Sequence, residues 1–239
     1  MGIFDSPVKA LEEFSALKLR QGTAREIPVR ADWEWPEEES LVLEEDTALE
    51  LGHPGLGSLS FLCWTEAKTE EPDRILLLGP DLGELKTRRA PLAQILVLHG
   101  RFQDEYDCYC ELRETVYTTR LRGLMTRVLP SRQTIWSRAT REALDQGLSL
   151  AHLGAALIKN LKQIEYVSAV QALFITESPA ELSGLIQVGR EAERIAGAMI
   201  KMNEEMSYDC DTCEFGDVCE KVLDLKKIRE KLMERNSGR

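Results

Sequence analysis

Three closely spaced cysteines near the C-terminal end are the residues of this chain best placed to do chemistry. Cys210, Cys213 and Cys219 follow a Cys-x2-Cys-x5-Cys spacing. A Cys-x-x-Cys turn directs two sulfurs at one point, and the next five residues let the chain return with a third thiolate. Such spacing is typical of iron–sulfur and zinc sites, so it predicts a metal site in this segment.

A fourth ligand would have to come from upstream, because no cysteine or histidine follows Cys219. The candidates are the three other cysteines, Cys63, Cys108 and Cys110. If residues 104–125 form a helix, the last two lie about 200° apart around its axis, so at most one would face a metal. The spacing favours a 4Fe-4S cluster, with zinc as the alternative. Reduced thiols packed in the core, or a redox pair in the Cys-x-x-Cys turn, are the other interpretations.

The composition is that of a globular protein with an acidic surface. The 239 residues are 43% hydrophobic and carry a formal net charge of −11. No apolar run is long enough to span a membrane, and the N-terminus lacks the basic and apolar regions of a signal peptide. We therefore expect a cytoplasmic protein with no membrane span, whose clustered cysteines bind metal. The negative charge argues against nucleic acid as a partner.

Seven arginines form a basic island in this acidic chain. They are Arg113, Arg120, Arg122, Arg127, Arg132, Arg138 and Arg141. Because a guanidinium group can bind phosphate through two hydrogen bonds, the island predicts an anionic, phosphorylated ligand. The alternative is a solvated helix face on which the arginines pair with acidic side chains.

The apolar periodicity predicts an α/β fold: a mixed β-sheet with flanking helices, a C-terminal cysteine loop and a short terminal helix. Strands are expected over residues 40–51, 58–65, 75–79, 95–99 and 167–176. Helices are expected over residues 6–20, 103–125, 137–146, 150–163, 178–206 and 220–234. A glycine-rich turn joins the first two strands, so we expect them to pair as a hairpin.

Three regions follow from this pattern. Residues 1–40 are expected to form an N-terminal helix and linker, and residues 41–206 an α/β domain. Residues 207–239 are expected to form the cysteine-rich metal-binding loop and the C-terminal helix.

Five short segments occur in an order known from one protein family. They are Thr47–Gly52, Leu78–Leu82, Pro91–Val97, Arg132–Arg138 and Val170–Thr176. This order, followed by a long helix that leads into a Cys-x-x-Cys, resembles the middle region of the acetyl-CoA synthase family. That family is the β subunit of the carbon monoxide dehydrogenase/acetyl-CoA synthase complex. The resemblance covers roughly residues 41–219.

The resemblance implies a metal centre that this chain matches only in part. The family holds a four-iron cluster, bridged to two nickel ions, with four clustered cysteines and a later Cys-Gly-Cys. Cys210 and Cys213 match the first two cysteines, and Cys219 is a more closely spaced third. The sequence contains neither the fourth clustered cysteine nor a Cys-Gly-Cys. Full acetyl-CoA synthase activity is therefore not expected from this polypeptide alone.

The resemblance also implies a ligand for the basic island. The family's middle region supplies arginines and a tryptophan for coenzyme A. The residues implied here are Arg120, Arg122, Arg127, Arg132, Trp136 and Arg138. For the tryptophan, the alternative is an aromatic residue of the core or of a hinge.

Three functions are compatible with these observations. The first is an iron–sulfur-binding accessory or regulatory protein that acts with a partner subunit in carbon monoxide and acetyl-CoA metabolism. The second is a subunit that presents coenzyme A within a multi-chain enzyme resembling acetyl-CoA synthase. The third is an interaction module with a structural zinc site.

Overall fold

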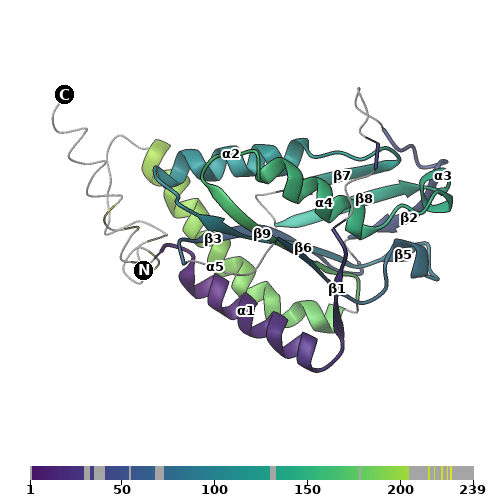
Figure 1. Ribbon diagram of the computed structural model, residues 1–239, viewed down its shortest axis with the longest axis horizontal. Helices are drawn as coiled ribbons and strands as arrows, with labels where there is room; N and C mark the ends of the chain where they lie inside the picture. The colour runs from purple at the N-terminus through teal and green to yellow at the C-terminus, as the bar shows by residue number, and fades with distance from the viewer. Residues whose placement is uncertain are drawn as a thin grey trace.

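The chain folds into two β-sheets, with helices covering both faces of the larger one (Figure 1). This computed structural model describes residues 2–29, 33–34, 41–53, 55–67, 73–129, 133–177 and 179–204, and single residues 215, 218, 222, 225 and 227. The mixed α/β fold expected from the sequence is confirmed. In the described part of the chain, no helix is long and apolar enough to cross a membrane.

The larger sheet has five strands in the order β1-β4-β9-β6-β3. The strands are β1 (Ala24–Ile27), β3 (Ser58–Thr65), β4 (Arg74–Leu78), β6 (Leu92–Gly100) and β9 (Val167–Ile175). β3 pairs with β6, and β4 with β9, in parallel, whereas the β6–β9 and β1–β4 pairs are antiparallel. The three inner strands are buried along nearly their whole length, which explains their continuous apolar runs.

The smaller sheet has four strands in the order β5-β2-β8-β7. They are β2 (Thr47–Leu51), β5 (Arg89–Ala90), β7 (Leu124–Leu129) and β8 (Thr134–Thr140). Along β8, buried residues alternate with half-exposed ones, which is the pattern of a sheet packed on one face only. The side chains on its open face are therefore available to solvent and ligands.

Two layers of helix enclose the five-stranded sheet. The helices are α1 (Asp5–Arg20), α2 (Glu105–Thr118), α3 (Arg141–Asp145), α4 (Leu150–Leu161) and α5 (Pro179–Glu204), with a short 3-10 turn, η1 (Leu82–Glu84). α1 and α5 pack together on one face, and α2 and α4 pack together on the other (Figure 1). Because β1 pairs with β4 and α1 packs on α5, the N-terminal segment joins the same core.

Several predicted elements are confirmed. The strand over residues 58–65 is found as predicted, and the runs near residues 75, 95 and 167 form β4, β6 and β9. The helices predicted from residues 6, 150 and 178 form α1, α4 and α5. The first predicted strand is shorter than expected, because within the described residues 41–51 the strand covers residues 47–51 only. The predicted C-terminal helix lies mostly outside the described residues.

The helix predicted over residues 103–125 is wrong in its last part. α2 ends at Thr118, and residues 124–129 form β7. At the helix end, the hydroxyls of Thr118 and Thr119 donate to the main-chain oxygens of Glu114 and Thr115. Such β-branched residues, which bond back to the main chain, weaken a helix. The helix predicted over residues 137–146 is wrong in its first part. Residues 137–140 belong to β8, and the helix covers residues 141–145.

The predicted hairpin between residues 40–51 and 58–65 is also wrong, because β2 and β3 belong to different sheets. β2 pairs with β5 and β8 instead. The sheets meet where β8 begins beside the edge of β3. There the Ser58 hydroxyl donates to the Ile135 carbonyl and accepts from the Ile135 N–H, and the Ser60 N–H donates to the Gln133 carbonyl.

Gly52, at the end of β2, is required by this junction. Its φ is +69°, and a Cβ atom there would lie 2.0 Å from the main-chain oxygen of Ile135. Gly22, after α1, has the same φ of +69° but no atom within 4 Å of a built Cβ. We predict that Gly22→Ala costs about 1–2 kcal/mol for the left-handed backbone alone. Gly52→Ala should cost about 1–3 kcal/mol more, because the backbone carbonyl must move.

Chemical denaturation of the two variants and the wild type measures this difference in the free energy of unfolding. Equal losses in the two variants would show that the approach of Ile135 to Gly52 does not constrain the junction.

Candidate functional site

The open face of the four-stranded sheet gathers charged and aromatic side chains from all four strands. We call this group the outer face: Glu50, Arg89, Arg127, Trp136 and Arg138. Arg138 lies opposite Glu50 of β2, and Trp136 lies opposite Arg127 of β7. Arg89 of β5 lies opposite Glu50 on its other side. Directly opposed residues project from the same face of a sheet, so the register brings these side chains together.

The indole of Trp136 is fixed from two directions. Its Nε1–H donates to Glu50 Oε1 over 2.8 Å, and the Arg138 guanidinium lies 4.4 Å from the centre of its ring system. Stacking of a guanidinium on an indole combines a cation–π interaction with apolar contact. Trp136 is therefore a half-exposed platform on the sheet rather than a core aromatic.

Glu50 is the anchor of the outer face. Arg89 Nε donates to its second oxygen over 2.7 Å, and only 12% of the Glu50 side chain is exposed. Partial burial acts to raise the pKa of this carboxyl, but the hydrogen bonds from Trp136 and Arg89 and the charge of Arg89 outweigh it and lower the pKa below its usual value. The ionised carboxylate thus holds both the indole and one arginine in place.

Arg138 has a donor without a partner. Its Nε is buried and finds no hydrogen-bond acceptor among the residues that the structure describes. A buried donor left unpaired costs free energy, so an acceptor supplied by a ligand would be favourable here. With three guanidinium groups and one carboxylate, the outer face carries a net positive charge in an acidic protein.

The structure places the other described arginines of the basic island on other parts of the chain. Arg122 pairs with Glu34 over 2.6 Å in the connection between α2 and β7, where Arg120 also lies. Arg113 belongs to α2 and Arg141 to α3, whereas Arg132 lies outside the described residues. Of the predicted phosphate ligands, the structure brings Arg127, Trp136 and Arg138 together. Glu50 and Arg89 were not among the predicted ligands, although the alternation within β2 is a signal for the former.

The cysteines divide into three that are described and three that are not. Cys63 is fully buried in β3, and burial raises the pKa of its thiol, which opposes the thiolate that a metal needs. Cys108 is buried too, its thiol donates to the Gln103 carbonyl over 2.9 Å, and burial raises its pKa. Cys110, two residues on, is exposed.

The predicted metal ligands of the C-terminal segment, Cys210, Cys213 and Cys219, lie outside the described residues. Among the residues that the structure does describe, no three histidine, cysteine or acidic side chains come together as a metal site.

We predict that Glu50→Gln lowers stability near neutral pH by about 1 kcal/mol, the difference between charged and neutral hydrogen bonds. Because the pKa of Glu50 is lower in the folded protein, its stabilisation is complete above the unfolded value of about 4.3. That stabilisation is lost as the pH falls through the folded pKa. Unfolding free energies measured from pH 7 to 3 should therefore converge for variant and wild type at the acid end. The exposed Glu45→Gln serves as the control, and a constant gap at all pH values would contradict this role.

Sequence similarity to known proteins identifies the family of this chain. Residues 35–180 match the family described as the CO dehydrogenase/acetyl-CoA synthase complex beta subunit. An acetyl-CoA decarbonylase/synthase complex subunit beta from Archaeoglobus fulgidus is 23% identical over 214 residues, which are 86% of this chain and 40% of that protein. The subunit from Methanopyrus kandleri is 28% identical over 44% of this chain and 22% of its own length.

Subunit beta 1 from Methanosarcina mazei is 22% identical over 72% of this chain and 38% of its own length. The chain thus spans less than half the length of these relatives. The matched region contains all four strands that contribute to the outer face, and it covers more than half of the sequence. This chain belongs to the CO dehydrogenase/acetyl-CoA synthase complex beta subunit family.

Proposed function

We propose that this chain is an accessory subunit that presents a phosphorylated ligand of the coenzyme A type on its outer face, together with a partner subunit. The observation that carries the proposal is the Trp136–Arg138 stack, in which a cationic donor without an acceptor lies on a flat aromatic surface. The relatives are named as subunits of an acetyl-CoA decarbonylase/synthase complex, which supports a protein partner and this class of ligand.

The chemistry of the outer face fits such a ligand. Phosphate oxygens are the acceptors that guanidinium groups bind best, and the Arg138 Nε has no protein acceptor. Arg127 lies opposite Trp136 in register, so a second cation flanks the same surface. Glu50 would repel an anion, but its two oxygens are already occupied by donors from Trp136 and Arg89.

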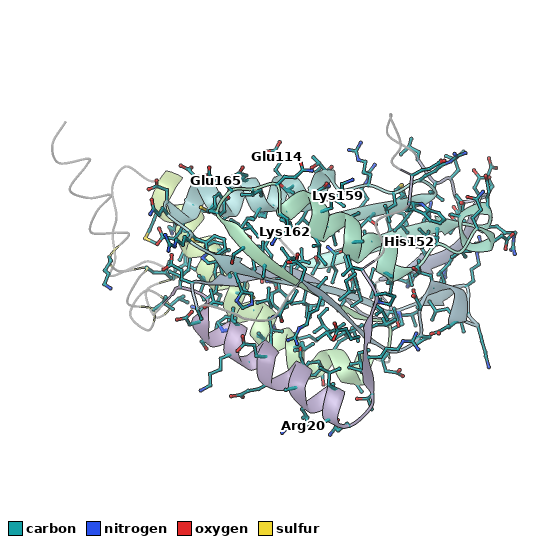
Figure 2. The ribbon with its side chains drawn as sticks, in the orientation of Figure 1. Arg20, Glu114, His152, Lys159, Lys162 and Glu165 are labelled. Atoms are coloured by element: carbon teal, nitrogen blue, oxygen red, sulfur yellow. The ribbon has the colours of Figure 1, made fainter. Side chains whose placement is uncertain are left out.

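We predict that Arg138→Met and Arg127→Met each weaken coenzyme A binding about tenfold or more, since a charge-assisted hydrogen bond contributes about 1.5–3 kcal/mol. Isothermal titration calorimetry with coenzyme A measures the dissociation constants. The matched control is Arg20→Met, because Figure 2 shows Arg20 at the end of α1, away from the four-stranded sheet. Raised salt should weaken wild-type binding more than binding to either outer-face variant. Equal weakening by Arg20→Met, or no binding of coenzyme A by the folded wild type, would contradict the proposal.

A second function, an iron–sulfur site in the C-terminal segment, is supported by the exposure of Cys110. Cys63 and Cys108 are buried and unsuited to ligation, so Cys110 is the described cysteine that can reach an external metal. It lies on α2, which packs against α5, and α5 leads directly into the cysteine segment. We propose that Cys210, Cys213 and Cys219 bind a 4Fe-4S cluster, with Cys110 as the fourth ligand.

We predict that protein purified without oxygen contains iron and sulfide and absorbs broadly near roughly 400 nm. Cys110→Ser should lower the iron content or speed its loss in air, whereas Cys63→Ala should leave the iron content unchanged. Metal and sulfide analysis of the three proteins tests both statements. Stoichiometric zinc in a colourless protein would favour the structural zinc site instead, and an unchanged Cys110→Ser protein would remove this residue from the ligand set.

A further inference from the structure

A partly enclosed cavity lies between α2, α5 and the edge strand β3. Its volume is about 60 Å³, enough for a few non-hydrogen atoms. Most of its wall is apolar and includes Phe61, Leu62, Leu96, Val116 and Val128. Val128 projects from the face of β7 opposite to Arg127, so the cavity and the outer face lie on different sides of the four-stranded sheet.

Two polar side chains in this wall have buried atoms without hydrogen-bond partners. Gln94 on β6 is 2% exposed, and its Oε1 accepts no hydrogen bond. Arg113 on α2 has a buried Nε that donates none. Buried polar atoms are nearly always paired, because an unpaired one loses its hydration without compensation. Two residues that line the same cavity thus each have a buried polar atom without a partner, an acceptor in Gln94 and a donor in Arg113.

Packing holds the Arg113 side chain in this wall. The Arg113 guanidinium lies 5.2 Å from the ring centre of Tyr109, which also lines the cavity. Gln133 closes another side, and its Nε2 donates to the Gly189 carbonyl over 2.6 Å. This cross-link ties the start of β8 to α5. The cavity thus has one cationic side chain held by packing, and a hydrogen bond joins two of its walls.

We propose that this cavity binds a small molecule with a primary carboxamide group. The amide N–H of the ligand would donate to Gln94 Oε1, its carbonyl would accept from Arg113 Nε, and a short alkyl part would contact the apolar wall. A carboxylate fits less well, because it has no proton to offer Gln94 Oε1 and the Glu193 side chain also lines the cavity. None of the outer-face residues lines the cavity, so the proposed carboxamide site can be tested independently of coenzyme A binding.

The test compares propionamide with sodium propionate at matched ionic strength, using the full chain. Amide chemical shifts in a nitrogen-15 correlation spectrum report binding, and the melting temperature reports stabilisation. Propionamide should shift resonances of α2, β6 and α5 and raise the melting temperature, and propionate should do so at least about fivefold more weakly. Gln94→Met, which keeps the volume and removes the acceptor, should weaken propionamide binding by a similar factor.

The control is Gln146→Met, an exposed glutamine whose side chain donates to Glu142 in α3, away from the cavity lining. Its response to propionamide should equal that of the wild type. Because Gln94→Met removes a buried amide whose oxygen is unpaired, the variant should remain folded, which separates loss of binding from loss of structure. Tighter binding of propionate, equal responses of Gln94→Met and wild type, or no response of the folded wild type to propionamide would each overturn the proposal. In the last case the cavity holds only water.

Discussion

The hydrogen bonds that join β8 to the edge of β3 are the constraint on which both sites depend. The Ser58 hydroxyl bonds to both the N–H and the carbonyl of Ile135. Two residues earlier in the chain, the Gln133 carbonyl accepts from the Ser60 N–H of β3. Trp136 follows directly on one side of this contact, and Gln133 borders the cavity on the other. These hydrogen bonds fix the small sheet to the large one between the outer face, which includes Trp136, and the cavity, which Gln133 lines.

The sequence predicted the larger sheet well, because β4, β6 and β9 are buried on both faces and read as continuous apolar runs. β7 and β8 were missed, because each strand is short and one end of it was included in a predicted helix, over residues 103–125 and 137–146 respectively. Arg127, Trp136 and Arg138 were nevertheless included as candidates. Their partners Glu50 and Arg89 were not, because only the pairing of distant strands places those residues beside the indole. The metal identity and the fourth cysteine ligand stay predictions.

The outer face lies wholly within the region matched by the family, whereas the cavity lies only partly within it. Residues 35–180 include all four strands of the outer face, so coenzyme A recognition would belong to the part of the chain shared with the family. One wall of the cavity comes instead from Ala192 and Glu193 of α5, beyond the matched range. A carboxamide site would thus combine the shared sheet with a helix outside the match. That helix also leads into the segment proposed to bind the cluster.

The junction between the sheets also has a consequence for the order of folding. Ser58 and Ile135 are separated by 77 residues, so their contact closes a long loop. The chain loses conformational entropy in closing this loop before the stabilising contacts of the small sheet have formed. The short strand β5 and the edge strand β7 contribute little on their own, and the small sheet gains most of its support once β8 has docked. We therefore expect the small sheet to form late. A ligand on its outer face would then slow unfolding far more than it would speed folding, because it stabilises contacts absent from the transition state.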